Sequence, residues 1–202
     1  MKNLLDMRLI KKIIIIITLI ISFQSLTKAD DIRDFEIEGI SIGDSLLDYF
    51  SKEMIEKEKT ENYDMYKDKE YSLVWLDGEE KFKNYDFLQI HLKTNDKDYI
   101  VRSIEGKIIY KNNIKDCYSK KDKILNEVKL IFPNSTVKNV KRKHAADPSG
   151  KSLTDSTYLY FNNKSGNAGV ACYDWSSELD HFDNLKVFID TSHFLNWLSR
   201  AH

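Results

Sequence analysis

The chain has 202 residues, of which 42% are hydrophobic and 12% aromatic, so it can build a sizeable core and wholesale disorder is excluded. Its 31 basic and 32 acidic residues give a formal net charge of −1. This balance lacks the positive excess that binding to nucleic-acid phosphates requires. A short basic run over 138–143 is the local exception, and runs of this length are typical of a solvated strand or loop edge.

The first 29 residues have the three-part layout of a secretory signal peptide. Four basic residues stand in the first twelve positions, an apolar run follows over Ile13–Ile21, and the small residue Ala29 precedes Asp30. The apolar run is shorter than the roughly 20 residues that span a bilayer. The sequence therefore predicts a signal peptide over 1–29, cleaved between Ala29 and Asp30. Retention of the segment as an anchor is the alternative.

Export would leave residues 30–202 as the mature protein. Without the signal peptide the chain keeps 26 basic and 31 acidic residues, a formal net charge of −5. No cysteine directly follows the apolar run, where a lipid would be attached. No later segment is long and apolar enough to cross a bilayer. We expect a periplasmic or secreted protein with no stable membrane span in the mature chain. It should form one domain, with two halves, 30–112 and 113–202, as a possible subdivision.

Cys117 and Cys172 are the two cysteines of the chain, and they do not form a CxxC motif. In an exported protein an even number of cysteines predicts a disulfide, because the compartment is oxidising. A bridge closing a loop of about 56 residues stabilises a fold by about 4 kcal/mol in the chain-entropy model. In the alternative, one cysteine is a nucleophile and His144 or His181 is its base. Neither cysteine, however, has a recognisable catalytic neighbourhood.

The first predicted helix begins at Ser45, which forms a loose capping pattern with Asp48. Its apolar positions recur on one helical face, at Leu46, Leu47, Phe50 and Met54. Charged residues dominate over 52–69, where we expect the helix to fray into an exposed connection. Alternating apolar and polar residues then predict three strands, at Tyr71–Leu76, Tyr85–Lys93 and Tyr99–Ile104.

After Gly106 the strand pattern resumes briefly and gives way to a second helix. Ser119 with Asp122 repeats the capping pattern, and Pro133 ends the helix. The final element is a short helix over Ser192–Leu198 with its apolar residues on one face. Between these helices three further strands are predicted, at Thr157–Phe161, Ala168–Trp175 and Leu185–Ile189.

This order predicts an α+β fold, with a helix plus a three-stranded antiparallel meander present twice, and a short C-terminal helix. The duplication is inferred from the order of elements alone, since the halves share no convincing residue identity. Helices would pack on one face of the sheet, because meanders can leave the other face wet. Cys117, just before the second helix, would tie that helix to Cys172 in the sheet. We expect Trp75 and Trp197 to be packed inside.

The segment 39–46, with two glycines four positions apart before a capped helix, resembles the opening of small exported helix-plus-sheet modules. Such modules occur in outer-membrane assembly lipoproteins and β-lactamase inhibitor proteins, and the resemblance implies a role in protein binding. This chain departs from the assembly lipoproteins because it lacks a lipid-bearing cysteine. "HAADPSGKS" and "CYDWS" also resemble segments of uncharacterised secreted proteins from AT-rich marine bacteria, and 26 Lys against five Arg fits such a genome.

The letters ADPSGKS over 146–152 end like a nucleotide-binding P-loop. A P-loop needs a glycine five positions before Gly150, so that successive backbone N–H groups can surround the phosphates, but this position is Ala145. Pro148 removes one donor, and the residues from Leu153 onward predict turn and strand instead of helix. We therefore expect a surface turn. The sequence predicts no cofactor.

A catalytic interpretation is available at His144, Asp147, His181 and Asp183. Imidazoles and carboxylates could catalyse hydrolysis or hold a divalent metal if their loops met. The spacing does not require this, because His and Asp in polar loops are more often solvated or turn-forming. No metal site is predicted, and a small extracytoplasmic hydrolase, with or without metal, is the alternative function.

Tyr158, Tyr160, Tyr173 and Trp175 fall at alternate positions of two neighbouring predicted strands. The two pairs could line one sheet face, where Tyr and Trp make an efficient contact surface. Burial in the core is the competing interpretation. We expect an exported, non-enzymatic binding or protein-interaction module. The sequence does not identify its partner, which could be a protein or a small ligand, or its oligomeric state.

Overall fold

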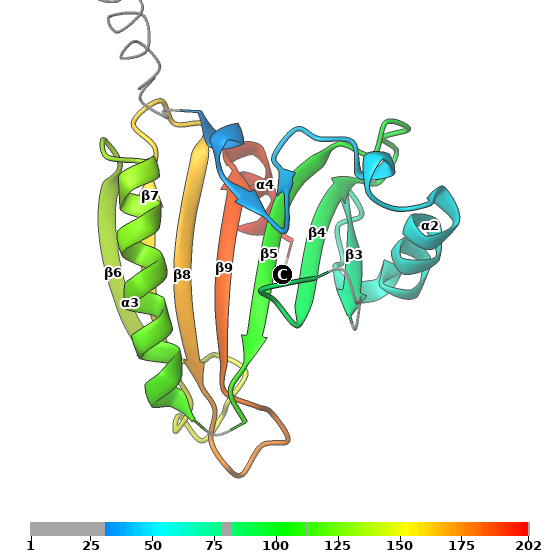
Figure 1. Cartoon of the computed structure of the whole chain (residues 1–202). Helices are drawn as coiled ribbons and strands as arrows, with labels where there is room; N and C mark the ends of the chain where they lie inside the picture. Colours follow the sequence, from blue (N-terminus) through cyan, green and yellow to red (C-terminus); the bar gives the residue numbers. More distant parts are fainter. Residues whose placement is uncertain (1–30, 78–81, 112, 202) are drawn as a thin grey trace, which may run out of the picture.

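The computed structural model describes residues 31–77, 82–111 and 113–201 (Figure 1). Its largest element is a seven-stranded antiparallel sheet in the order β3-β4-β5-β9-β8-β7-β6. The predicted signal peptide and its cleavage site lie outside the described residues. The strands span Tyr71–Asp77 (β3), Phe87–Lys93 (β4), Val101–Ile109 (β5), Thr136–Lys143 (β6), Leu153–Tyr160 (β7), Gly166–Asp174 (β8) and Asn184–Thr191 (β9).

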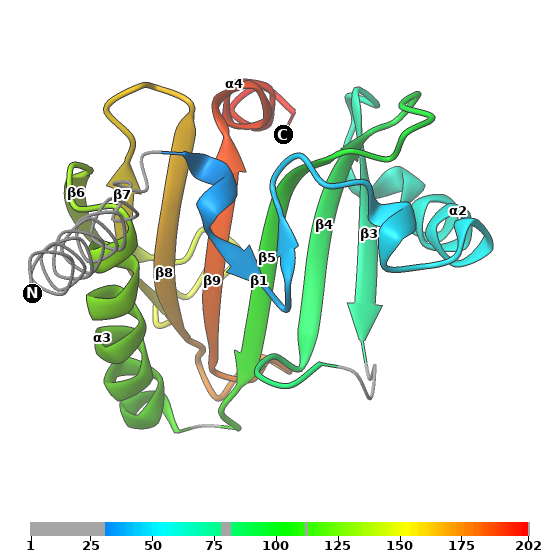
Figure 2. The ribbon, with the colours of Figure 1, turned by 45° about the horizontal axis from the view of Figure 1, so that its top comes forward.

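Helices and a small hairpin accompany the sheet. The described α-helices are Lys52–Glu61 (α2), Ile114–Ile131 (α3) and Ser192–Leu198 (α4). Glu36–Ile37 (β1) and Ile40–Ser41 (β2) form the hairpin, and short 3-10 helices span Ile32–Asp34 (η1), Leu46–Asp48 (η2) and Tyr63–Met65 (η3). The hairpin and α3 lie on one face of the sheet, α4 lies on the other, and α2 stands beside the edge strand β3 (Figures 1 and 2). None of the described helices has the length and apolar character needed to span a membrane.

The main core lies between the sheet and α3 with the hairpin. Successive strand residues point to opposite faces, so Ile104 and Val187 point into this layer, where both are fully buried. Val128 of α3 and Ile37 of the hairpin belong to the same buried cluster. Burying each such side chain contributes about 1.5–3 kcal/mol, so this layer supplies most of the driving force for folding.

Two side chains join α3 to the sheet. A disulfide links Cys117 to Cys172 of β8, with the Cα atoms 6.0 Å apart, which confirms the predicted bridge. One turn further along, Lys121 is only 6% exposed and donates from Nζ to the backbone oxygen of Asp155 at 3.0 Å. The same ammonium pairs with the Asp155 carboxylate on β7. The helix is therefore held over both strands.

The predicted start of this helix at Ser119 is wrong, because α3 begins at Ile114 and Cys117 lies in its first turns rather than before it. The buried residues of α3 are Cys117, Lys121, Leu125 and Val128. This stripe has helical spacing, but its second member is a lysine. The pattern of apolar residues therefore indicates a helix only from a point closer to its C-terminus. Burial of Lys121 is a tertiary effect, because it depends on Asp155.

The first helix is also displaced from its predicted position. Ser45 precedes only the short η2, and the chain turns before α2 begins. The cap of α2 is Ser51, whose hydroxyl accepts a hydrogen bond from the backbone N–H of Met54 at 3.2 Å. The charged residues expected to fray thus form the helix itself. Ile55 is its fully buried residue, so a single anchor position is enough for a helix at the edge of the sheet.

Two strands differ from expectation. β5 does not stop at Gly106, and a Cβ atom there would lie 2.6 Å from the Tyr85 ring, so the glycine leaves room for that ring. β6 is a further strand, and it contains the basic run that was expected at a strand or loop edge. It forms one edge of the sheet, where lysines discourage pairing with another chain.

The α+β class is confirmed, with sheet as the dominant element. The finer description, a helix with a three-stranded meander present twice, is not confirmed. The second half contributes four strands, and β5 of the first half pairs with β9 of the second. Both halves therefore contribute to the same sheet.

Replacing Cys117 and Cys172 together by alanine should lower the free energy of unfolding by about 2–4 kcal/mol. The bridge restrains the unfolded chain over a sequence separation of 55, and both sulfur atoms belong to buried residues. Urea unfolding followed by circular dichroism measures the loss. Ser119→Ala, at an exposed position of α3, is the control and should change stability by less than about 0.5 kcal/mol. Equal stability with and without the bridge would contradict this account.

Candidate functional site

The sheet face opposite α3 has a covered end and an open end. At the covered end, Phe194 and Trp197 of α4 pack against Tyr71, with ring centroids 5.4 and 4.8 Å apart, and all three residues are buried. Toward the other end, strand positions and the residue that follows β8 carry aromatic side chains that are only half-buried: Trp75, Phe87, Tyr158, Tyr173 and Trp175. We call this part of the face the open end.

The four aromatic residues predicted for binding all lie on this face. Tyr158 pairs with Gly169 and Thr154 pairs with Tyr173 across β7 and β8, so the strand register places both aromatic pairs on one side. Tyr158 and Tyr160 stack with ring centroids 6.0 Å apart, and Tyr173 and Trp175 stack at 6.4 Å. Tyr160 is 39% exposed. The structure thus presents them as two stacked pairs, and their role in binding stays a prediction.

The two histidines join the aromatic cluster. The ring centroids of His144 and His181 lie 4.3 and 4.5 Å from that of Trp175. His144 also lies 5.6 Å from Tyr173. Partial burial, followed by the nearby positive charges, lowers the pKa of His144. Both imidazole rings therefore pack against Trp175.

The two aspartates of the catalytic interpretation hold backbone instead. Asp183 is buried and accepts a hydrogen bond from the backbone N–H of Trp175 at 2.9 Å. Asp147 is buried and accepts from the backbone N–H of Ser152 at 2.8 Å. Within the described residues, no hydrogen bond or ion pair joins either carboxylate to His144 or His181. The structure therefore brings the two histidines of the alternative catalytic set to the same Trp175 ring, but it joins neither of them to the aspartates by a hydrogen bond.

Residues 146–152, which end like a P-loop, form the turn between β6 and β7. Asp147 accepts hydrogen bonds from the Ser152 hydroxyl at 2.7 Å and from the backbone N–H of Ser149 at 2.9 Å. These bonds hold the pKa of Asp147 well below its usual range. Gly150 has φ of 67°, and β7 follows the turn directly. The expected surface turn is confirmed.

Charged side chains of β5 and β9 lie next to the aromatic side chains of the open end. Lys107 of β5 and Lys186 of β9 stand directly opposite each other in the strand register. Lys186 Nζ lies 2.5 Å from Glu105 Oε2 and 5.6 Å from the centre of the Tyr173 ring. Lys107 Nζ lies 4.8 Å from the centre of the Trp75 ring. Burial and then the Lys186 charge lower the pKa of Lys107 to about 8.

A second buried acid lies nearer the covered end. Asp190 of β9 is 7% exposed, and its Oδ1 atom accepts a hydrogen bond from the Ser103 hydroxyl at 2.7 Å. Burial, and then the charge of Glu105, raise the pKa of Asp190 to about 7. The face therefore contains ionisable groups that its environment strongly perturbs, a property typical of functional sites.

At the open end, a pocket of about 380 Å³ lies between Trp75 and Phe87 on one side and Trp175 on the other. This volume lies in the range of small-molecule sites, which are mainly apolar with a few polar groups. One wall comes from β3 and β4, and the other comes from the loop between β8 and β9. The lining residues are Trp75, Phe87, Lys107, Ile109, Trp175, Asp180, His181, Phe182 and Asn184.

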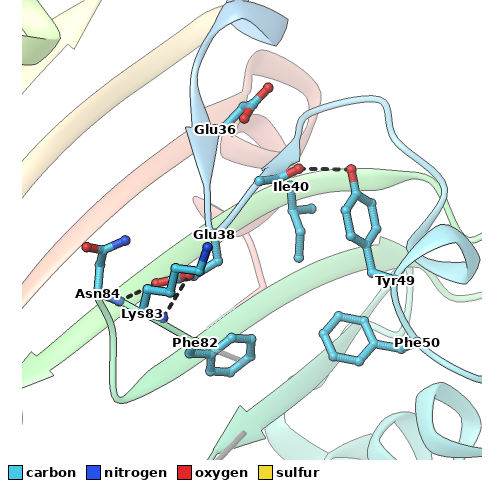
Figure 3. A pocket seen from close by; sticks show the side chains of 9 residues that line it. Glu36, Glu38, Ile40, Tyr49, Phe50, Phe82, Lys83 and Asn84 are labelled. Carbon is cyan, nitrogen blue, oxygen red and sulfur yellow. Dashed lines mark hydrogen bonds between the residues drawn. The ribbon is translucent and has the colours of Figure 1, made fainter. Parts of the chain in front are cut away.

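A second pocket, of about 470 Å³, lies on the other face beside the β1–β2 hairpin (Figure 3). The hairpin turns at Glu38 and Gly39, whose φ values are 53° and 80°, as a two-residue type I′ turn requires. The Glu38 carboxylate accepts hydrogen bonds from the backbone N–H groups of Lys83 and Asn84, at 3.0 and 2.6 Å (Figure 3). This carboxylate therefore attaches the hairpin to the segment that precedes β4.

Tyr49 completes the same arrangement. Its hydroxyl lies 2.9 Å from the backbone oxygen of Gly39 (Figure 3). It also lies 2.7 Å from the Asp44 carboxylate. The hydrogen bond with Asp44 and burial raise the pKa of Tyr49 to about 12. Because these polar groups hold local structure, we take the pocket on the sheet face as the candidate site.

Comparisons with protein-family models, with curated proteins and with solved structures found no match. The resemblance of residues 39–46 to small exported binding modules therefore stays a prediction. In the structure these residues contain β2 and the start of η2. Within the described part of the chain, no group of three or more His, Cys, Asp or Glu side chains is placed to hold a metal ion.

Sequence reasoning missed Lys107, Lys186 and Glu105, and it placed Trp75 in the core. Trp197 is buried as expected, at 1% exposure, but Trp75 is half-buried at the pocket. The available signal was the alternation of Glu105 and Lys107 within one strand, which puts both charges on the same face. This alternation does not predict that Lys186 of β9 lies beside them, because that depends on which strands pair.

Asp190→Asn should remove part of the decline in stability between about pH 4 and pH 7. The pKa of Asp190 rises from 3.8 to about 7 on folding, so the folded chain binds the proton more tightly than the unfolded chain. The free energy of unfolding then falls as the pH rises through this window. At pH 8 the variant should be more stable by on the order of 1 kcal/mol or more.

Urea unfolding of both proteins from pH 4 to pH 8 tests this expectation. Asn keeps an oxygen that can accept from Ser103, so the hydrogen bond at 2.7 Å is preserved. Asp122→Asn, at an exposed position of α3, is the control and should leave the pH profile unchanged. Parallel profiles for Asp190→Asn and the parent protein would refute the assignment.

Proposed function

We propose that this protein is an exported, non-enzymatic binding module that contacts its partner through the open end of the sheet face. One observation carries the proposal. Half-buried aromatic side chains from both halves of the chain, including Trp75, Tyr173 and Trp175, gather there around a pocket of about 380 Å³. Rigid Tyr and Trp side chains supply much of the binding energy at protein contact surfaces.

The two ends of the face provide an internal contrast. At the covered end, Phe194 and Trp197 are each 1% exposed, as expected of aromatic residues that serve stability alone. At the open end the aromatic residues keep part of their surface in solvent, and Phe182 in the adjoining loop is 53% exposed. Exposed apolar surface of this kind commonly marks an interaction site.

The compartment is consistent with this role. The buried Cys117–Cys172 disulfide suggests an oxidising environment, as found outside the cytoplasm. We propose that residues 1–29 direct export to the periplasm or beyond it. The formal charge of −5 in the mature chain makes nucleic acid an unsuitable partner.

The competing proposal, a hydrolase that uses His144, Asp147, His181 or Asp183, receives less support. Both aspartates are engaged with backbone N–H groups, and both histidine rings pack on Trp175. Among the described residues no hydrogen bond joins either aspartate to either histidine, so the contact that would orient an acid–base pair is missing.

Protein isolated from the envelope or medium of its native host should begin at Asp30. The small residue Ala29 before this position matches what signal peptidases accept. Intact-mass measurement and N-terminal sequencing provide the test. Both thiols should resist alkylation until a reductant is added. Full-length material that begins at Met1, or two freely alkylated cysteines, would contradict export to an oxidising compartment.

Trp175→Ala and Tyr173→Ala should each weaken partner binding by at least about tenfold, because truncating a central aromatic contact costs more than about 1.4 kcal/mol. The immobilised mature protein is incubated with envelope extract and medium from the host, and retained proteins and small molecules are identified by mass spectrometry. Leu130→Ala, at a residue 82% exposed on α3, is the matched control on the opposite face.

Thermal unfolding of each variant verifies that the fold survives. Capture that depends on Leu130 and not on Trp175 or Tyr173 would move the binding surface to the helical face and overturn the proposal.

A further inference from the structure

We infer that the pocket at the open end binds an organic carboxylate with a planar apolar body, and that the carboxylate pairs with the ammonium group of Lys107. This inference rests on the proposed binding function and names the class of ligand. Its argument is the charge balance of the sheet face together with the aromatic lining of the pocket.

The charge balance leaves one ammonium group without a carboxylate. Lys107 and Lys186 are register partners, and like charges placed directly opposite each other on a sheet repel. Glu105 pairs with Lys186, and the two side chains are only 15% and 20% exposed. Among the described residues, no carboxylate oxygen lies within 4.0 Å of Lys107 Nζ. Within salt-bridge distance the two lysines thus share one acid, Glu105.

The position of Lys107 makes this imbalance costly. Its side chain is half-buried, and its ammonium lies 4.8 Å from the centre of the Trp75 ring. A partly buried charge requires a partner, or it pays a desolvation penalty. A ligand carboxylate would give Lys107 an ion-pair partner, as Glu105 does for Lys186. A cationic ligand would add a third positive charge, and a neutral one would leave Lys107 unpaired.

The walls of the pocket select the rest of the ligand. Trp75 and Phe87 form one wall, with their rings in edge contact at 6.0 Å. Trp175 forms part of the other wall, where His181 supports it at 4.5 Å. Ile109 contributes apolar surface from β5. Aromatic and aliphatic walls favour a flat apolar body beside the charged group.

The pH dependence of affinity provides a second test of the pairing between Lys107 and the ligand carboxylate. Charged or titratable groups that face Lys107 are Lys186, Glu105, Asp77, Asp180 and His181. Burial and then Lys186 lower the pKa of Lys107 to about 8, so the ammonium loses its proton as the pH rises from 7 to 9. Affinity for a carboxylate should therefore fall across this range, whereas affinity for a neutral analogue should not.

Three probes of one shape test the inference: 2-naphthoate, 2-naphthamide and (2-naphthyl)methylammonium. Each is titrated into the mature protein at pH 7 and pH 9, followed by NMR up to millimolar concentration and by tryptophan fluorescence. Trp75 and Trp175 line the pocket, whereas Trp197 is buried at the covered end. At pH 7 the naphthoate should bind at least tenfold more tightly than the amide or the ammonium compound. This preference should shrink at pH 9.

Variants identify the residue responsible. Lys107→Met should abolish the preference for naphthoate over naphthamide, and Lys107→Arg should retain it. Lys129→Met, at an exposed position of α3 on the opposite face, is the matched control and should change nothing. Lys107→Met should fold well, because it removes a like charge facing Lys186. Urea unfolding should show equal or higher stability.

Equal affinities for naphthoate and naphthamide, a preference that survives in Lys107→Met, or no binding of any probe would each overturn the inference. These results would not by themselves remove the proposed function. Partner capture that still depends on Trp175 would show binding through the open end without a carboxylate, whereas capture independent of Trp175 and Tyr173 would overturn the proposed function.

Discussion

The pairing of β5 with β9 is the contact on which the rest of this structure depends. These strands come from opposite halves of the chain, and their register runs from Ser103 with Asp190 to Ile109 with Asn184. The pairing joins seven strands into one sheet. It also brings Glu105 beside Lys186 and sets Lys107 directly opposite Lys186. Without this register the charges of the open end would belong to separate surfaces.

The second organising feature is the unequal covering of the two faces. α3 is held to one face by the Cys117–Cys172 disulfide and by Lys121, which reaches Asp155 on β7. The hairpin extends the same layer, where Glu38 attaches it to residues 83 and 84. On the other face α4 covers only one end (Figures 1 and 2). A short helix thus leaves part of an aromatic sheet surface in contact with solvent.

The groups on that surface are poorly suited to stability alone. Asp190 has a pKa of about 7 and Lys107 one of about 8, because burial disfavours the charged form of each. An apolar residue at either position would avoid this cost. Departures from the rules of stable packing are expected where a protein binds its ligand. The perturbed acid and the perturbed base lie on the face that also carries the half-buried aromatic residues, and this coincidence links the energetics to the proposed function.

The sequence by itself determined the features that local chemistry dictates: the disulfide, the turn at residues 146–152, the helix Ser192–Leu198 and the alternation that places Tyr158 and Tyr173 on one face. Tertiary structure decided the rest. α3 begins earlier than its apolar pattern because the buried Lys121 is one of its core-facing residues. Pairing with β4 and β9 continues β5 through Gly106, which leaves room for the Tyr85 ring. Periodicity tells which face of a strand a residue occupies, but it does not name the neighbouring strand. The meeting of Lys107, Glu105 and Lys186 therefore depended on a pairing between distant segments.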